Sequence, residues 1–166
     1  MEIQNIELYK NFRNVELEFR VSVKQNQFEQ CLKFLQENFE ETVIHTIDLF
    51  DKNSNRKSID TNLIIKKENK FMSYLRFKDF SIKFCINIEN PLEIKKFVTC
   101  FERKKERHKF IDKTLDYINY DLTIINNELY EIEIEIDPIM SLYHTSEYIF
   151  DNSFKKLKTL LTCSDF

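Results

Sequence analysis

The 166-residue sequence contains no glycine and no tryptophan. Phosphate-binding loops of the P-loop and dinucleotide-binding kinds need glycine, because their backbone adopts torsion angles that other residues disfavour. The absence of glycine therefore excludes both kinds of site. If this chain handles phosphate, its side chains must do the binding.

Other signals are missing as well. The four cysteines (Cys31, Cys85, Cys100 and Cys163) show neither a CxxC pair nor a zinc-type spacing to a histidine, which is typical of reduced intracellular thiols. The sequence has no apolar run near the roughly 20 residues of a membrane-spanning helix, and its start lacks a signal-peptide pattern. The formal net charge is only −3, so any anion site must be local. We expect one domain over residues 1–166, without a membrane partner.

The most regular pattern in the chain is Tyr-Glu-Ile-Glu-Ile-Glu-Ile-Asp at residues 130–137. Acidic and apolar side chains alternate there, and the two-residue period of a β-strand sends them to opposite faces. Two ionised carboxylates about 6 Å apart repel by roughly 2–3 kcal/mol at an effective dielectric constant of about 20. The pattern therefore predicts a strand whose acidic face meets a cationic group.

Two more segments repeat this alternation. In Val-Glu-Leu-Glu-Phe-Arg-Val-Ser-Val at residues 15–23, Glu16, Glu18 and Arg20 share one face and the apolar residues share the other. In the basic segment at 103–107, Arg103, Lys105 and Arg107 have the same parity. Two acidic strands and one basic strand indicate a polar interior with an apolar outer surface.

The remaining segments favour antiparallel β structure. We expect helices over 25–39, 92–100 and 146–161, and strands over 14–23, 42–50, 56–61, 62–67, 71–78, 80–88, 101–110, 115–125 and 129–137. Residues 1–13 are expected to form a turn or a short strand, and Asn126-Asn127 a tight hairpin. The fold class is mainly β (α+β): a closed antiparallel barrel of about eight strands that forms a polar tunnel, with helices packed on its outside.

The motifs also resemble a known family. Glu-Leu-Glu-Phe-Arg at 16–20 and Glu-Ile-Glu-Ile-Glu at 131–135 resemble the paired glutamate motifs of triphosphate tunnel metalloenzymes. The order of features resembles, more narrowly, the metal-dependent RNA 5′-triphosphatases of fungi, microsporidia, protozoa and large DNA viruses. Three further matches are Arg103-x-Lys105-x-Arg107, Asp121-Leu-Thr123 and the segment from Lys83 to Glu89.

The resemblance implies a role for each matching residue. A divalent Mg²⁺ or Mn²⁺ ion, which prefers hard oxygen ligands, would be held by Glu16, Glu18, Glu131 and Glu135. The triphosphate would be bound by Arg56, Lys67 (or its neighbour Lys66), Lys83, Arg103, Lys105, Arg107, Asp121 and Thr123. Glu89 or Glu133 would orient or deprotonate the attacking water, while Arg103, Lys105 and Arg107 neutralise the charge of the reacting phosphates.

The implied activity is removal of the γ-phosphate from 5′-triphosphate RNA, the first step of mRNA cap formation, together with metal-dependent hydrolysis of nucleoside triphosphates. A stand-alone enzyme of this kind would work beside an RNA guanylyltransferase; alternatively, the domain belongs to a longer capping protein. Its location would be nuclear if the chain is cellular, or a cytoplasmic viral factory if it comes from a large DNA virus. The apolar outer wall would serve either a homodimer or the protein's own helices.

Other interpretations stay open at this point. The same tunnel residues would suit an enzyme that hydrolyses inorganic tripolyphosphate, thiamine triphosphate or nucleotides. A third hypothesis is a non-catalytic β-barrel module whose charged strands face solvent or a partner. The basic segment could also be an exposed helix in which Glu102 and Glu106 pair with its cations. Which phosphate Arg20 contacts, if any, is not fixed by the pattern.

Overall fold

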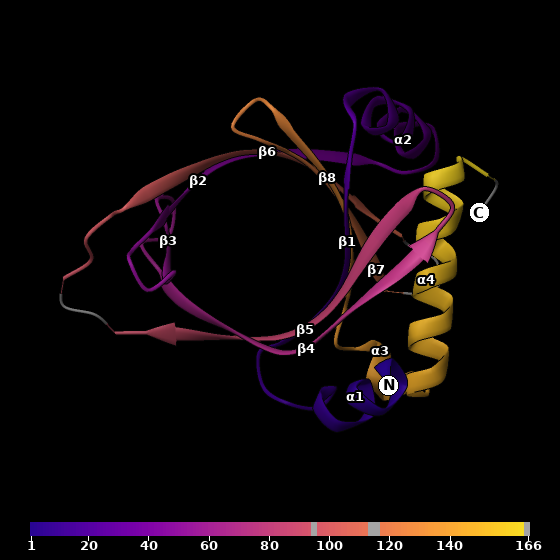
Figure 1. Cartoon of the computed structure of the whole chain (residues 1–166), viewed down its shortest axis with the longest axis horizontal. Helices are drawn as coiled ribbons and strands as arrows, with labels where there is room; N and C mark the ends of the chain where they lie inside the picture. The colour runs from indigo at the N-terminus through magenta and orange to yellow at the C-terminus, as the bar shows by residue number, and fades with distance from the viewer. Residues whose placement is uncertain (94–95, 113–116, 165–166) are drawn as a thin grey trace.

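Eight antiparallel strands close into a barrel in the order β1-β5-β4-β3-β2-β6-β7-β8 (Figure 1). The computed structural model describes residues 1–93, 96–112 and 117–164. The strands are β1 (Val15–Val23), β2 (Glu41–Phe50), β3 (Arg56–Ser58), β4 (Ile64–Phe77), β5 (Phe80–Leu92), β6 (Phe101–Ile111), β7 (Ile118–Ile125) and β8 (Leu129–Ile136). The helices are α1 (Glu2–Tyr9), α2 (Gln25–Asn38), α3 (Met140–Tyr143) and α4 (Ser146–Thr162). The predicted fold class is confirmed.

The hydrophobic core lies between the outer wall of the barrel and the helices. Phe19 of β1 and Ile132 and Ile134 of β8 are fully buried on that side. The Phe19 ring packs against Phe84 of β5 and Phe150 of α4, with ring centroids 4.9 and 5.6 Å apart. Figure 1 shows α1, α2 and α4 gathered along one side of the barrel. The alternating strands therefore bury their isoleucines outward, which leaves the charged face for the interior.

Strand register sets which charged residues become neighbours. Between β1 and β8, Glu18 lies opposite Glu135 and Arg20 lies opposite Glu133. Between β6 and β7, Arg107 lies opposite Thr123. Because residues directly opposite one another share a face of the sheet, all of these side chains point to the same side of the barrel wall.

Two of the predicted elements are wrong, and the predicted basic strand is confirmed over its helical alternative. Residues 2–9 form the helix α1, not a turn or strand, and its Ile6 is fully buried. The four short strands expected between 56 and 88 are three, because β4 continues through a bulge between Asn69 and Phe71. The basic segment is the strand β6, which rules out the helical alternative for it.

The helix expected over 92–100 is also wrong. The described part of that range contains no helix, and residues 94–95 lie outside the described residues. Instead β5 continues to Leu92, with Pro91 opposite Ile65 of β4. Pairing of β1 with β5 ends at Ile88, so Pro91 lies on an edge where its missing N–H removes no ladder hydrogen bond. The start of the strand expected over 115–125 also lies outside the described residues, and the short helix α3 was not expected.

Tight turns are made without glycine. Positive φ angles occur at Asn14, Ser54, Asn62, Lys78, Tyr117, Asn126, Asn127 and Cys163 among the described residues. Half of these positions are asparagines, whose short polar side chain tolerates the left-handed region best after glycine. The predicted Asn126-Asn127 hairpin is confirmed, with φ angles of 51° and 59°. No helix in the described part of the chain is long and apolar enough to span a membrane.

Lys78 in the β4–β5 hairpin should be a removable source of strain. Its φ is 51°, a region that costs a residue with a Cβ about 1–2 kcal/mol, whereas glycine enters it freely. After allowing for the extra chain entropy of glycine, we expect Lys78→Gly to raise the free energy of unfolding by about 0.5–1 kcal/mol. Urea denaturation of both proteins measures the change. The neighbouring Asp79→Gly serves as the control, because Asp79 has no positive φ; a loss of stability in Lys78→Gly would refute the expectation.

Candidate active site

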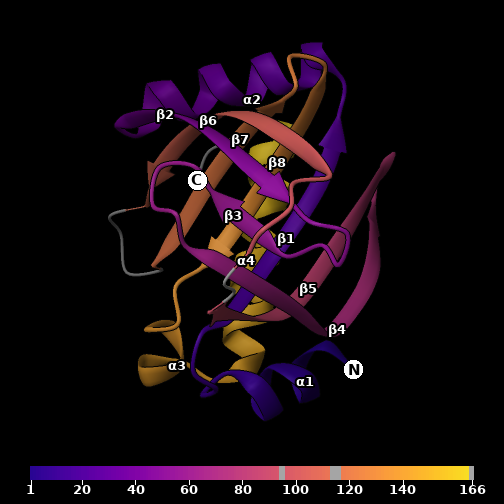
Figure 2. The ribbon, with the colours of Figure 1, turned by 90° about the vertical axis from the view of Figure 1, so that its left-hand side faces the viewer.

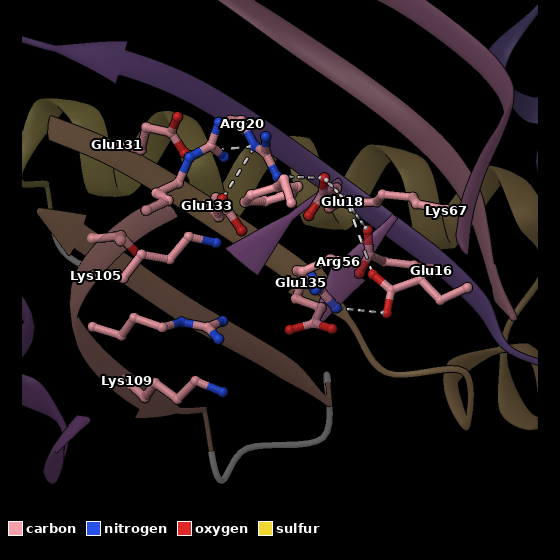
Figure 3. A pocket seen from close by; sticks show the side chains of 15 residues that line it. Glu16, Glu18, Arg20, Arg56, Lys67, Lys105, Lys109, Glu131, Glu133 and Glu135 are labelled. Atoms are coloured by element: carbon pink, nitrogen blue, oxygen red, sulfur yellow. Dashed lines mark hydrogen bonds and ion pairs between the residues drawn. The ribbon is translucent and has the colours of Figure 1, made fainter. Parts of the chain in front are cut away.

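The interior of the barrel holds a polar cavity of about 370 Å³ (Figure 3). Its lining is almost entirely ionic and comes from β1, β2, β3, β4, β5, β6, β7 and β8. The lining residues are Glu16, Glu18, Arg20, Phe50, Arg56, Lys67, Glu89, Arg103, Lys105, Arg107, Lys109, Thr123, Glu131, Glu133 and Glu135. Acidic and basic side chains are therefore enclosed together in one water-accessible tunnel.

One end of the acidic wall is neutralised by Arg20 of β1. Its guanidinium lies 3.0 Å from Glu18 Oε1 and 3.1 Å from Glu133 Oε1, with Glu131 Oε2 at 3.8 Å. Figure 3 shows the Arg20 guanidinium between these glutamates. Three carboxylates around one cation raise the pKa of Arg20 further, although its burial opposes the shift. Arg20 thus forms ion pairs with two glutamates of β8.

The other end of the acidic wall surrounds the ammonium group of Lys67. The Lys67 Nζ lies 3.0 Å from Glu16 Oε1, 3.9 Å from Glu18 Oε1 and 3.8 Å from Glu89 Oε1. Arg56 of β3 also reaches Glu89, at 3.5 Å. Three carboxylates from β1 and β5 thus converge on a position that already holds a positive charge.

A metal site requires several carboxylates that converge on one point, as these do. Carboxylate oxygens are the ligands that Mg²⁺ and Mn²⁺ prefer, and the Lys67 ammonium marks a point where they gather round a cation. Within the described residues, no three His, Cys, Asp or Glu side chains already form a finished metal-binding group. Glu16 and Glu18 of this set, with Glu135 opposite Glu18 in the β1–β8 ladder, are donors that fit a hard divalent ion once Lys67 moves aside. Glu131, about 13 Å along β8 from Glu135, contacts Arg20 instead.

The basic wall is formed by alternate residues of β6. The Lys105 ammonium lies 3.2 Å from Asp48 Oδ2 of β2, and Arg107 forms an ion pair with Asp121 of β7. Thr123 donates a hydrogen bond to Asp121 Oδ1 at 3.2 Å, which fixes that carboxylate behind the arginine. Arg103 and Lys109 line the tunnel at the two ends of this row, and in the described part of the chain neither has a carboxylate within ion-pair distance.

Each wall is therefore neutralised largely within itself. Arg20, Lys67 and Arg56 neutralise the glutamates, whereas Asp48 and Asp121 neutralise the β6 cations. Among the described residues, no ion pair joins a β6 cation directly to a glutamate of β1 or β8. The space between the walls can thus receive a ligand that carries both signs, such as a polyphosphate with a divalent cation.

Burial and neighbouring carboxylates raise the pKa values of two glutamates to near neutral pH. Burial and the nearby Glu18 raise the pKa of Glu133 to about 8. Burial and a hydrogen bond shared with Glu16 raise the pKa of Glu89 to about 7. A carboxyl whose pKa lies near the working pH is suited to proton transfer.

The pKa values of the remaining glutamates of the wall shift in different directions. Burial raises the pKa of Glu18 and of Glu135, and repulsion from Glu16 adds to both shifts. Burial opposes ionisation of Glu16 too, but Lys67 outweighs it and holds the pKa of Glu16 below its usual range. The metal-free site therefore favours the ionised form of Glu16.

The structure brings together most of the residues that the sequence predicted for the site. Every predicted residue lines the tunnel except Lys83 and Asp121. Lys83 lies opposite Arg20 on β5, in an adjoining cavity. Asp121 is 2% exposed and lies behind Arg107 in the wall. Of the two candidates in β4, Lys67 lines the tunnel and Lys66 instead contacts Glu68 on the surface.

Sequence reasoning missed four residues as parts of the site. Lys109 continues the parity of Arg103, Lys105 and Arg107, so the alternation could have identified it. Asp48 interrupts an apolar run in β2, which was a usable signal. The alternation places Arg20 on the charged face of its strand but does not identify the glutamates that it contacts. Phe50 carries no charge, and nothing in its local sequence distinguishes it from a core aromatic residue.

This closed barrel of eight antiparallel strands around an ionic cavity has the fold of solved RNA triphosphatases. Schizosaccharomyces pombe Pct1 RNA triphosphatase, in complex with the Spt5 CTD, superposes with a TM-score of 0.71 at 14% identity, over 97% of this chain and 93% of that one. The Mimivirus capping enzyme triphosphatase gives a TM-score of 0.65 at 14% identity, over 96% and 95%. At such identities the likeness establishes the fold.

The same fold also occurs outside these enzymes. A chain of the Schizosaccharomyces pombe Mediator head module superposes with a TM-score of 0.58 at 11% identity, over 89% of this chain and 94% of that one. No family model and no curated protein sequence matches the chain. Any activity of this chain therefore depends on the residues inside the tunnel.

Proposed function

We propose that this protein is a metal-dependent RNA 5′-triphosphatase that hydrolyses the bond between the β- and γ-phosphates of 5′-triphosphate RNA. The observation that carries the proposal is the pair of facing walls, glutamates of β1, β5 and β8 on one side and the β6 cations on the other, inside one closed barrel. Phosphoryl transfer needs mainly positioning and charge stabilisation, so such a tunnel suffices without a nucleophilic side chain.

The divalent ion would be held by Glu16, Glu18 and Glu135. Bound there, Mg²⁺ or Mn²⁺ would act as a Lewis acid that polarises an oxygen of the γ-phosphate. Glu18 and Glu135 lie opposite each other in the β1–β8 ladder, and Glu16 follows on the same face of β1. Repulsion among these carboxylates, which raises the pKa of Glu135, would be relieved by the positive charge.

The β6 row would bind the phosphates. Lys105 and Arg107 point into the tunnel while Asp48 and Asp121 hold them from behind, so both cations are positioned before the substrate arrives. Arginine can bind two phosphate oxygens at once, whereas lysine supplies a point charge. Glu89 and Glu133, with pKa values of about 7 and 8, are the candidates to orient the water and accept its proton.

The proposed biological setting is cap formation. The products would be inorganic phosphate and RNA with a 5′-diphosphate end, which is the substrate class of an RNA guanylyltransferase. We place the protein beside such an enzyme, either as a separate partner or in a longer chain. The setting would be a nucleus for a cellular protein or a cytoplasmic viral factory for a viral one.

Phosphate release from a 5′-triphosphate RNA oligonucleotide tests the proposal directly. We expect release that needs Mg²⁺ or Mn²⁺, stops on addition of EDTA, and leaves a 5′-diphosphate end. Inorganic tripolyphosphate at equal concentration is the comparison substrate, and the RNA should be hydrolysed faster.

The two other hypotheses give different outcomes in the same assay. Faster release from tripolyphosphate than from RNA would indicate a small-molecule triphosphatase. The absence of metal-dependent release from RNA, ATP and tripolyphosphate alike would indicate a non-catalytic module with this fold.

A further inference from the structure

The two ends of the tunnel differ in chemistry. At one end, which we call the aromatic mouth, Phe50, Phe101 and Arg103 come from the end of β2 and the start of β6. At the other end, the acidic mouth, Glu16, Glu89 and Glu135 share a surface cavity with Leu63. A polyanion such as RNA is repelled by clustered carboxylates, so this asymmetry bears on the direction of entry.

The aromatic mouth presents a stacked pair of rings. Phe50 and Phe101 lie opposite each other in the β2–β6 ladder, with ring centroids 4.7 Å apart and ring planes only 7° from parallel. The Arg103 guanidinium lies 5.2 Å from the centroid of Phe50. Phe101 is 48% exposed, so its ring is open to solvent.

A second cavity of about 440 Å³ adjoins the tunnel and reaches the aromatic mouth at Phe50. It shares Glu18, Arg20, Phe50, Arg56 and Lys67 with the tunnel. Its further lining residues are Ser54, Ile65, Asn69, Met72, Lys83, Cys85 and Asn87, none of which is acidic. We call it the entrance bay. Figure 2 shows the β4–β5 hairpin, which supplies much of its floor, extending beyond the rest of the barrel.

The entrance bay adds the groups of a nucleoside site to the charged residues that it shares with the tunnel. Phe50, Ile65 and Met72 give it apolar surface, and Ser54, Asn69 and Asn87 add hydrogen-bonding groups. Its volume falls within the roughly 300–1,000 Å³ of small-molecule pockets. Lys83 at the bay and Arg103 at the rings have no carboxylate within ion-pair distance among the described residues, so both are free to meet phosphates.

From this geometry we propose that the 5′-terminal nucleoside of the substrate binds in the entrance bay and that its base packs against the Phe50–Phe101 pair. The triphosphate then extends inward between the two walls, and the next phosphates of the RNA pass Lys83 and Arg103. Aromatic rings stack on any base, so the site would favour nucleotides over inorganic polyphosphate without selecting a sequence. This inference rests on the proposed function for the identity of the natural ligand.

Single-tryptophan reporters test the inference by binding alone, because the natural sequence has no tryptophan. Phe101→Trp carries the reporter at the aromatic mouth. Leu63→Trp is the matched control at the acidic mouth, since Leu63 is 47% exposed against 48% for Phe101. We expect ATP with Mg²⁺ to quench Phe101→Trp but not Leu63→Trp, and tripolyphosphate with Mg²⁺ to quench neither. Equal quenching by ATP and tripolyphosphate, quenching only in Leu63→Trp, or no quenching at all would overturn the inference.

Kinetics give a second and independent readout. Base stacking on an aromatic residue is typically worth a factor of about 10 or more in affinity, so Phe50→Ala should raise the ratio of KM for ATP to KM for tripolyphosphate about 10-fold. Leu63→Ala should leave this ratio unchanged. An unchanged ratio in Phe50→Ala would overturn the inference. If the natural protein hydrolyses neither substrate, the proposed function fails, and the fluorescence experiment still decides whether a nucleoside binds at the aromatic mouth.

Discussion

Replacing Glu135 by glutamine should remove nearly all phosphate release and yet stabilise the metal-free protein. The proposed ion needs the Glu135 carboxylate, and losing several kcal/mol of metal-assisted stabilisation corresponds to a fall in turnover of about 1,000-fold. Without metal, burial and repulsion from Glu16 and Glu18 disfavour the ionised carboxylate. Glutamine has the same shape and no charge, so we expect the free energy of unfolding to rise by about 1 kcal/mol near pH 8.

The pH dependence follows from the same shift. Because the folded state raises the pKa of Glu135 above the ordinary 4.5, the native protein holds this proton to a higher pH than the unfolded chain does. The contribution of Glu135 to the free energy of unfolding therefore falls as the pH rises from about 4.5 through the pKa of the folded state. It is lowest at pH values above that folded pKa. Glu135→Gln removes this contribution. Urea denaturation at pH 5 and pH 8 in EDTA should show the gain mainly at pH 8.

Glu16→Gln is the matched control. It lies on the same wall, but Lys67 holds its pKa low, so its ionised form stabilises the fold. We expect Glu16→Gln to lose turnover as Glu135→Gln does, while stability falls by about 1–2 kcal/mol because the charged hydrogen bond to Lys67 is weakened. If both variants were destabilised equally, or if Glu135→Gln kept near-normal turnover, the assignment of Glu135 to a metal site would fail.

The charged strands could be predicted from sequence because the alternation of charged and apolar residues can be recognised within a few positions. Strict alternation fixes both the strand and the face on which each glutamate lies, and the hydrophobic side then requires a covering layer. The helices α2 and α4 appear where that layer is needed, and they bury Phe28, Leu157 and Leu160. The closed barrel followed from placing two acidic strands and one basic strand around a shared interior.

The ion-pair partners could not be predicted, because they depend on strand order. The sequence suggested that β6 faces the glutamates and neutralises them across the tunnel. In the barrel, β2 and β7 flank β6, and they bring Asp48 and Asp121 beside Lys105 and Arg107. Lys67 reaches Glu16 because β4 lies beside β5, which itself pairs with β1. Such neighbours come from register between distant segments, which local periodicity does not contain.

The mistaken helix over 92–100 has a similar origin. Asn-Pro at 90–91 is a good local signal for a helix start, but the same residues pair with Lys66 and Ile65 in the long β4–β5 ladder. The hairpin between Phe77 and Phe80 sets the register of that ladder, and Phe80 lies ten residues before Asn90 in β5. Tertiary pairing therefore overrides a local preference that would otherwise be reasonable.

The fold alone leaves the activity open, since a Mediator head module chain has it as well. An enzyme of the proposed kind needs cations that are held in place but do not form ion pairs with the glutamates across the tunnel. Arg107 is the clearest case, since Asp121 positions it from behind and Thr123 in turn holds Asp121. This arrangement allows the catalytic and structural contributions of a tunnel cation to be separated by experiment.

Arg107→Ala should reduce both turnover and stability. Loss of a charge that stabilises the reacting phosphates typically costs about 100- to 1,000-fold in rate. The substitution also leaves Asp121, which is 2% exposed, without its cation, and an unpaired buried carboxylate of this kind costs about 3 kcal/mol. Phosphate release with RNA and urea denaturation measure the two effects on the same preparation.

A second substitution should restore stability without restoring turnover. In Arg107→Ala with Asp121→Asn, the buried charge is gone, and the asparagine can still accept the hydrogen bond from Thr123. We expect most of the lost free energy of unfolding to return while phosphate release stays low, because no arginine contacts the phosphates. Arg107→Lys should fall between, since it keeps the charge but not the paired N–H groups that match phosphate oxygens. Recovery of turnover in the double variant would mean that Arg107 serves only to balance Asp121, and the basic wall would then have to bind the triphosphate through Lys105 and its other neighbours.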